Sequence, residues 1–284
     1  MDSDEFHYLA ADGLSLYARV WAPEGEPRGV VALVHGLGEY GGRYQAVGQQ
    51  FVERGYVFVA GDLRGHGMSE GRRAYAGRLD DFLDDLDRYL DEIRTRFPRL
   101  PLFLYCFSMG STIGAVYLIR RHPRVAGAVL ASGGFLLPGA SVGAMRTVKA
   151  MRHLAPTVAV SNGLGANRDK VCHDTGVLDA YDADPLVYKK ITVGLAAIIA
   201  EAAGEALTRA SEIQAPVLVM HGADDIIALP EGSQRVAEAV PGDATLKVWP
   251  GLYHFIHHEP DGAGQQVIAF AADWMDARSA RSQS

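Results

Sequence analysis

The sequence predicts a doubly wound α/β fold with a mostly parallel sheet, an antiparallel hairpin at the amino end and an inserted helical cap. Two short valine-rich runs, 29–34 and 57–60, have no polar side, which is typical of strands covered on both faces. Segments with helical periodicity alternate with such runs, and this alternation favours a doubly wound sheet. The stretch 137–207 breaks the alternation, so we expect a cap inserted in a core of residues 1–136 and 208–284.

The individual elements follow from periodicity and from turn residues. Apolar and polar residues alternate on both sides of residues 11–13, which predicts a β-hairpin that ends near Pro23. Residues 43–54 have a helical period and stop at Gly55. In the segment 79–97 the apolar residues share one helical face, so we expect its many aspartates to lie on a solvated face. Further strands are expected at 102–106, 127–130, 217–220 and 246–249, and further helices at 110–122, 233–240 and 265–278.

The composition is that of an ordinary globular protein, with 48% hydrophobic and 21% charged residues. A net charge of -7 argues against a nucleic-acid partner, which would need a basic stripe. Cys106 and Cys172 match no metal-ligand spacing, so we expect two free buried thiols, no metal and no cofactor. The amino end lacks the basic and apolar regions of a signal peptide, and no apolar run is long enough to span a membrane. We therefore expect a cytoplasmic protein.

Within the expected cap, residues 141–154 have the pattern of a basic amphipathic helix. Such a helix could lie on a lipid surface, which would give transient membrane-surface contact by a protein that is peripheral at the membrane. The interpretation that we favour is that its apolar side covers the pocket. The apolar residues are Val142, Met145, Val148 and Met151, and the basic residues are Arg146, Lys149 and Arg152.

A candidate nucleophile, Ser108, lies between an expected strand and an expected helix. This is the context of a nucleophile elbow, in which a sharp turn presents the serine oxygen above the carboxyl edge of a sheet. The usual pattern is G-x-S-x-G, and Cys106 stands here at the first glycine while Gly110 keeps the second. Cysteine is small enough to fit at that crowded position. Alone, S-x-G is also typical of an ordinary helix start.

Chain order strengthens this interpretation. In the α/β-hydrolase fold the acid follows a later strand and the histidine comes last. The strand at 217–220 is followed by a turn that contains Asp224 and Asp225, and we assign the acid to Asp225 because the turn needs two residues after Gly222. The glycine turn after the last strand leads to His254, which we assign as the general base that Asp225 orients.

Hydrolysis of an ester also needs donors for the oxyanion of the tetrahedral intermediate. In this fold one N–H group comes from the residue after the nucleophile and a second from the loop after an earlier strand. We assign these donors to the backbone of Met109 and of Leu37. His254 would then take the proton of Ser108, and an acyl-enzyme would form that water hydrolyses.

A competing motif lies in the same loop. Residues 36–41 read G-x-G-x-x-G after a strand and before a helix, and Asp62 follows at the spacing of a dinucleotide site. Such a site would indicate an oxidoreductase. That hypothesis leaves Ser108, Asp225 and His254 unexplained, so we favour the hydrolase.

With these residues in place, the chain resembles the monoacylglycerol lipases and the related bacterial lysophospholipases of the α/β-hydrolase superfamily. The resemblance covers residues 14–274, and the block 35–44, His-Gly-Leu-Gly-Glu-Tyr-Gly-Gly-Arg-Tyr, is fairly specific to this family. The block 62–69, Asp-Leu-Arg-Gly-His-Gly-Met-Ser, is common to many α/β hydrolases. The other shared segments are 107–110, 181–187, 221–225, 251–254 and 259–260.

The resemblance implies the same catalytic and oxyanion residues and adds three that would bind substrate. Glu39, Arg43 and His257 would fix the polar glycerol end, while the cap would form an apolar tunnel for the acyl chain. An internal salt bridge between Glu39 and Arg43 that braces the oxyanion loop is an equal alternative for those two residues.

The chain departs from the family pattern around the expected nucleophile. Cys106 and Phe107 stand where the family has Gly-His, Tyr40 where it has His, and Phe255 where it often has Glu. These changes make the surroundings of the site bulkier and more apolar. The resemblance therefore implies a serine hydrolase that cleaves carboxylic esters, with monoacylglycerols as the expected substrates. Lysophospholipids, short-chain esters and a non-catalytic ligand-binding homologue are the alternatives.

Overall fold

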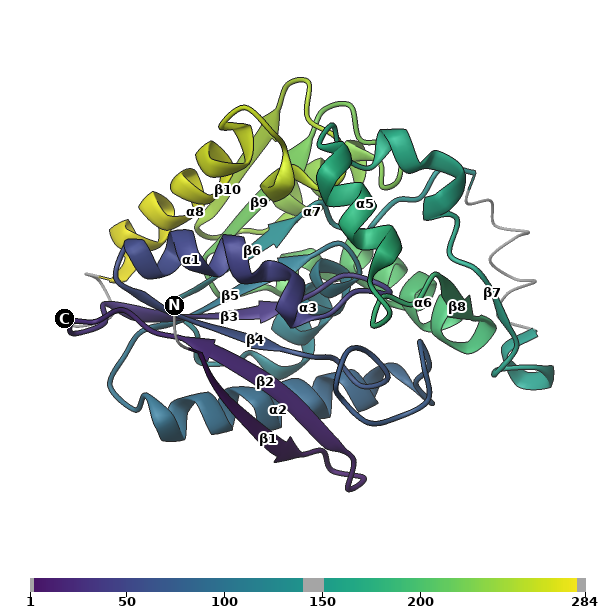
Figure 1. The fold of residues 1–284 in the computed structure, drawn as a ribbon, viewed down its shortest axis with the longest axis horizontal. Coiled ribbons are helices and arrows are strands. Elements are labelled where there is room, and N and C mark those ends of the chain that lie inside the picture. Colours follow the sequence, from purple (N-terminus) through teal and green to yellow (C-terminus); the bar gives the residue numbers. More distant parts are fainter. Residues whose placement is uncertain (1–2, 140–150, 280–284) are drawn as a thin grey trace.

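The computed structural model describes residues 3–139 and 151–279, and an eight-stranded sheet lies at its centre (Figure 1). The strand order is β1-β2-β4-β3-β5-β6-β9-β10. β1 (Asp4–Leu9) and β2 (Ser15–Trp21) form the expected antiparallel hairpin, and β2 also pairs antiparallel with β4 (Tyr56–Gly61). The other neighbours are parallel: β3 (Gly29–Val34), β5 (Leu102–Phe107), β6 (Gly127–Ala131), β9 (Val217–Gly222) and β10 (Ala244–Trp249). The predicted doubly wound sheet is thus confirmed.

Helices cover both faces of the sheet and complete two hydrophobic clusters. Side chains of β5 alternate between them, with Leu104 and Cys106 in one cluster and Phe103 and Tyr105 in the other. Both faces of this strand are therefore dry, as its apolar run predicts. One face carries α1 (Gln45–Glu53), which follows the 3-10 turn η1 (Gly41–Tyr44), and α8 (Ala263–Ser279). The other face carries α2 (Leu79–Arg96), α3 (Met109–Arg121), α6 (Val193–Arg209) and α7 (Pro230–Ala239).

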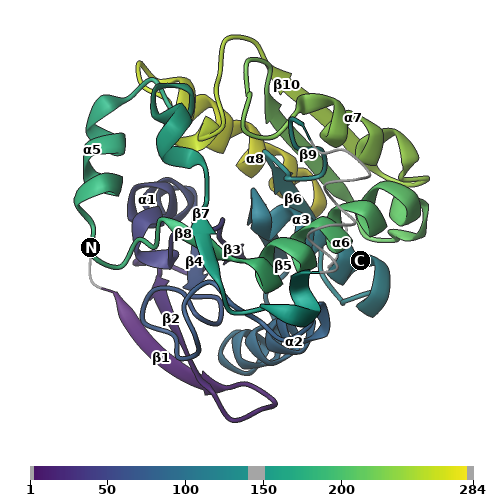
Figure 2. The same cartoon turned by 90° about the vertical axis from the view of Figure 1, so that its right-hand side faces the viewer.

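The segment between β6 and α6 lies beyond the carboxyl ends of the parallel strands and faces the viewer in Figure 2. It contains β7 (Ala159–Ser161) and β8 (Lys190–Thr192), which pair antiparallel, and the helices η2 (Leu164–Lys170) and α5 (Thr175–Ala183). The expected amphipathic helix at 141–154 lies outside the described residues except for 151–154, which are helical. Among the described helices, none has the length and apolar character that crossing a bilayer requires.

The packing of helix α6 indicates where the cap ends. Its residues Leu195, Ile198 and Ala202 are buried in the same hydrophobic cluster as α2 and α3. The range 137–207 stays a prediction for the cap. From this packing we propose that the cap ends near Thr192 and that α6 belongs to the core.

Two local expectations differ from the structure. β9 continues two residues beyond Met220, because His221 and Gly222 still pair with the neighbouring strand β10. The expectation of a fully solvated acidic face on α2 is wrong for Asp85, which is 2% exposed. Its carboxylate accepts hydrogen bonds from Arg64 Nε at 2.6 Å and Nη2 at 2.7 Å, so α2 anchors the loop after β4. The short helices η3 (Ala210–Glu212) and η4 (Ile256–His258) complete the described elements.

Cys106, which replaces the first glycine of the elbow pattern, fits because another glycine faces it. The thiol is fully buried between β5 and α3. A Cβ atom on Gly114 of α3 would lie 2.5 Å from Cys106 Sγ, closer than such atoms approach in proteins. Because Gly114 on the helix has no side chain, there is room for Cys106 on the strand.

Replacing Gly114 with alanine should therefore destabilise the fold. We expect the free energy of unfolding to fall by about 1–3 kcal/mol, the usual cost of overpacking a core. In a Cys106→Ala background the cost should be smaller, since the remaining Cys106 Cβ position lies 3.3 Å from the new atom. Urea unfolding of the two single variants, the double variant and the parent measures this coupling. An equal cost in both backgrounds would contradict this account of the packing.

Candidate active site

Ser108 lies in the sharp turn between β5 and α3, in a conformation that non-glycine residues rarely adopt. Its φ is 52° and its ψ is −115°, and strain of this kind typically costs about 1–3 kcal/mol. Surrounding contacts enforce it: the Ser108 N–H donates to Ala131 O at 2.9 Å. Gly110 lets α3 approach β3 so closely that a Cβ atom there would lie 2.0 Å from Val34 O. The turn therefore presents Ser108 at the carboxyl edge of the sheet.

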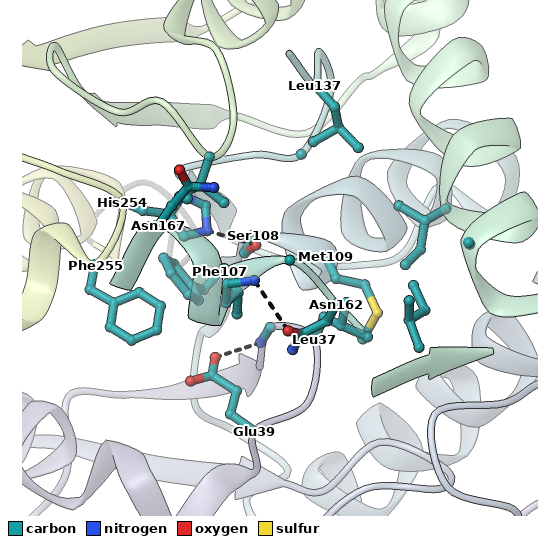
Figure 3. A pocket seen from close by; sticks show the side chains of 18 of the residues that line it. Leu37, Glu39, Phe107, Ser108, Met109, Leu137, Asn162, Asn167, His254 and Phe255 are labelled. Atoms are coloured by element: carbon teal, nitrogen blue, oxygen red, sulfur yellow. Dashed lines mark hydrogen bonds between the residues drawn. The ribbon is translucent and has the colours of Figure 1, made fainter. Parts of the chain in front are cut away.

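Ser108, His254 and Asp225 form one hydrogen-bonded chain. His254 Nε2 lies 3.0 Å from Ser108 Oγ, and His254 Nδ1 lies 2.7 Å from Asp225 Oδ2. A dashed line in Figure 3 marks the hydrogen bond between His254 and Ser108. Because a carboxylate only accepts, Nδ1 carries a proton, and the neutral ring offers its bare Nε2 to the serine hydroxyl. Asp224, the competing acid, is exposed to solvent. The structure thus brings together the three residues that chain order selected.

The Asp225 carboxylate accepts four hydrogen bonds. Oδ1 accepts from the backbone N–H groups of Ile227 at 2.8 Å and Ala228 at 3.0 Å. Oδ2 accepts from His254 and also from His221 Nε2 at 2.9 Å. Burial alone would raise the pKa of Asp225, but the neighbouring His254 and the hydrogen bonds from both imidazoles hold this pKa well below its usual range. The group is therefore a carboxylate throughout the neutral pH range.

The two expected oxyanion donors lie beside the serine. Leu37 and Met109 both line the cavity above Ser108. In residues 3–139 and 151–279, neither of their N–H groups has a hydrogen-bond partner. Met109 is the first residue of α3, where N–H groups lack partners within the helix and favour negative charge. Both N–H groups are thus available to a molecule in the cavity, as the expected role requires.

Glu39 braces the loop that carries Leu37. Its Oε1 accepts the N–H of Gly36 at 2.8 Å and the O–H of Tyr44 at 2.5 Å. Burial raises the pKa of Glu39, although the Tyr44 hydrogen bond and the charge of Arg43 oppose this rise. Glu39 also lines the cavity (Figure 3). The side chain can therefore both hold the loop and contact a bound alcohol.

Arg43 lies behind the cavity and faces the cap. Its guanidinium carbon lies 4.8 Å from the centroid of the Tyr181 ring, and Nη1 lies 3.9 Å from Asp184 Oδ2. Among the described residues no ion pair joins Arg43 to Glu39, so the bracing of the oxyanion loop comes from hydrogen bonds to Glu39 instead. Arg43 is not among the described residues that line the cavity.

His257 also lies behind the described cavity lining. Its ring packs edge-on against Phe107, with centroids 4.6 Å apart, and Tyr105 Oη lies 3.4 Å from Nδ1. Burial holds the pKa of His257 well below its usual value, so this imidazole is neutral. The departure at Phe107 therefore places an aromatic ring between His257 and the cavity.

A cavity of about 390 Å³ opens above Ser108, within the usual size range of small-molecule sites. Its described polar lining includes Glu39, Asn162, Asn167 and His254 (Figure 3). The apolar lining comes from the core, the cap and the loop after β9, and it includes Leu137, Ile191, Ile199, Ile226, Ile227 and Phe255. Such a cavity suits a long apolar group with one polar end near the serine.

Sequence reasoning missed three residues of this site. His221 is the second histidine that is hydrogen-bonded to Asp225. Its position at the end of β9, directly before the turn that contains Asp225, was a signal in the sequence. Asn162 and Asn167 gave no signal, because only the tertiary fold brings the cap over Ser108.

The competing dinucleotide motif has a structural explanation. Asp62, at the spacing expected for a ribose contact, is 1% exposed and accepts the N–H groups of Gly41 at 2.7 Å and Met68 at 2.8 Å. Its two carboxylate oxygens thus connect the loop after β4 to the glycine loop at residues 36–41. The spacing between the glycine loop and Asp62 is therefore explained by the packing of these two loops.

Comparison with known proteins identifies the family. The sequence profile of a hydrolase family described as serine aminopeptidase, S33, matches residues 25–261. A monoacylglycerol lipase from Mycolicibacterium smegmatis is 34% identical over 90% of this chain and 92% of that protein. An uncharacterised abhydrolase domain-containing protein from Dictyostelium discoideum is 29% identical over 98% of this chain, which spans 29% of that protein's length.

A solved structure extends this likeness to three dimensions. The crystal structure of a monoacylglycerol lipase from Paleococcus ferrophilus superposes with a TM-score of 0.83 at 28% identity. The match covers 93% of this chain and 99% of that one, so it includes both the sheet and the segment above it. The chain therefore belongs to the monoacylglycerol lipase-like family of α/β hydrolases, a family of carboxylic ester hydrolases.

Proposed function

We propose that this protein is a serine esterase that hydrolyses monoacylglycerols to a fatty acid and glycerol. One observation carries the proposal: the chain of hydrogen bonds from Ser108 through His254 to Asp225 lies at a mostly apolar cavity of about 390 Å³. A single-chain lipid ester matches this arrangement, because its acyl chain needs apolar walls and its one ester carbonyl must reach the serine.

The first half of the reaction forms the acyl-enzyme. His254 Nε2 accepts the proton of Ser108 as the serine oxygen attacks the ester carbonyl. The carbonyl oxygen becomes an oxyanion and binds the N–H groups of Leu37 and Met109. Asp225 stabilises the imidazolium that forms, and the imidazolium then donates its proton to the leaving alcohol.

The second half releases the acid. A water molecule takes the place of the alcohol, and His254 accepts its proton while the oxygen attacks the acyl carbonyl. The second tetrahedral intermediate uses the same two N–H donors and collapses to the free acid and Ser108. Glu39 lines the cavity and would contact the alcohol in the first half, before it leaves.

The charge of the cavity lining favours a neutral polar head group over a phosphate. No lysine or arginine is among the described lining residues, and a phosphate usually binds such cations. This observation supports a glycerol ester over a lysophospholipid. Short-chain esters also fit the cavity, but their acyl groups would contact less of its apolar wall.

The proposed nucleophile can be tested by covalent labelling. We expect a fluorophosphonate probe to label the parent protein and not Ser108→Ala, and the variant to lose at least about a thousandfold in kcat because the covalent step is gone. Labelling of both proteins, or turnover by Ser108→Ala above about one thousandth of the parent rate, would assign the reaction to another residue. An unlabelled, inactive parent would instead indicate a ligand-binding homologue.

The proposed acyl site can be tested by reducing its volume. Ala196 on α6 lines the cavity, whereas Ala200, one turn later, is not among the described lining residues. We expect Ala196→Phe to lower kcat/KM for long-chain monoacylglycerols more than for short synthetic esters, and Ala200→Phe to leave this ratio unchanged. The same panel, with a lysophospholipid and an aminoacyl anilide added, tests the substrate class in the parent. Faster cleavage of either added substrate would contradict the monoacylglycerol proposal.

We further propose that the cap contacts a lipid surface when substrate is taken up. Large apolar side chains are exposed around the cavity, and two of them, Leu137 at 42% and Ile226 at 45% exposure, also line it. Leu154 at 86% and Val158 at 50% exposure are further exposed apolar side chains in the segment between β6 and α6. An apolar rim that runs into the cavity gives a lipid a path that avoids water.

A charged residue on the cap should slow the uptake of substrate from a lipid surface and leave the rate of the chemical step unchanged. We expect Leu154→Asp to reduce hydrolysis of monoacylglycerol in vesicles several-fold, because a carboxylate resists the bilayer interface, and to leave hydrolysis of a dissolved short ester unchanged. Leu9→Asp is the matched control, since Leu9 is 66% exposed on the amino-terminal hairpin. Equal rates on vesicles for all three proteins would contradict surface contact through the cap.

A further inference from the structure

Asp225 is shared by two serine–histidine pairs, and only one of them faces the cavity. The first pair is Ser108 with His254, which is hydrogen-bonded to Asp225 Oδ2. In the second, Ser233 Oγ on α7 lies 2.7 Å from His221 Nδ1, and His221 Nε2 lies 2.9 Å from the same Oδ2. Two imidazoles therefore approach one carboxylate oxygen from different elements.

The contacts of His221 determine which of its nitrogens carries the proton. Nε2 lies 2.9 Å from Asp225 Oδ2 and 2.9 Å from Ala228 O, and both of these atoms can only accept. Nε2 must therefore be protonated and shared between them. In the neutral ring Nδ1 then accepts the hydroxyl proton of Ser233. The serine thereby fixes the ring in the one tautomer that donates to Asp225.

The second pair cannot act as a second reaction centre. His221 and Ser233 are both 0% exposed, and neither is among the described residues that line the cavity. No ester could reach Ser233 without opening the packing between β9 and α7. The pair can act only through Asp225.

We propose that His221, held by Ser233, is a positioning residue of the ester hydrolase that fixes the orientation of Asp225. Without the His221 hydrogen bond, Oδ1 would stay bound to the N–H groups of Ile227 and Ala228, but Oδ2 would keep only His254 as a side-chain donor. The carboxylate could then tilt about its Cβ–Cγ bond as far as the two backbone hydrogen bonds allow. The lone pair aimed at His254 Nδ1 would then be less well directed. The imidazolium formed in the transition state would lose part of its stabilisation.

The test compares two substitutions of similar size at His221. The side-chain nitrogen of glutamine can take the place of Nε2 and donate to Asp225, whereas asparagine is too short to reach. We expect His221→Asn to lower kcat per titrated active site by about 10- to 100-fold, the size of one lost hydrogen bond to a charged group, and to leave KM unchanged. His221→Gln should restore kcat per titrated site to near that of the parent.

Active-site titration separates positioning from mere folding. A purely structural histidine would lower the number of titratable sites and leave kcat per site as in the parent, and this result for His221→Asn would overturn the inference. If His221→Asn gives no folded enzyme, Ser233→Ala decides instead. A loss of about threefold or more in kcat per site with unchanged KM supports the inference, and an unchanged kcat overturns it.

The inference rests on the proposed catalytic roles of Ser108, His254 and Asp225, and the Ser108→Ala variant distinguishes the two failures. Activity in Ser108→Ala would remove the proposed nucleophile itself. An inactive Ser108→Ala together with a fully active His221→Asn would leave the proposed function standing and remove only the role of His221.

Discussion

The close approach of α3 to the end of β3 is the contact on which the site depends. A side chain at Gly110 would collide with Val34 O at 2.0 Å, so only glycine allows the helix to begin there. This packing lets α3 begin directly after the strained turn at Ser108. It also places Met109 close to the loop that starts at His35 and carries Leu37. The proposed nucleophile and the proposed oxyanion donor that follows it are therefore placed by a contact between two backbones.

The cap supports the catalytic loops as well as covering them. The N–H of Tyr188 in the cap donates to Gly38 O at 2.8 Å, which fixes the oxyanion loop. On the other side, the N–H of Phe255, next to His254, donates to Val171 O at 2.9 Å. One inserted segment therefore contacts both the loop that carries Leu37 and the loop that carries His254.

The departures from the family pattern have local physical reasons. The Cys106 thiol occupies space that Gly114 leaves open. The ring of Phe107 lies 5.2 Å from that of His254 and 4.6 Å from that of His257, so it fills the floor of the site with apolar surface. A drier floor strengthens the hydrogen bonds between His254 and Asp225, since less water competes for them. The same change separates His257 from the cavity.

The sequence by itself determined the order of strands and helices outside the segment 137–207, the elbow at Ser108 and the choice of His254 and Asp225 as candidates, because each depends on local periodicity, turn chemistry or position along the chain. It did not determine the contacts that join distant segments. The burial of Asp85 against Arg64, the second histidine on Asp225 and the placement of Arg43 behind the cavity are decided by how loops pack across the sheet edge. Such contacts depend on the charge, burial and shape of segments that are far apart in the sequence. Only the tertiary structure brings these segments together.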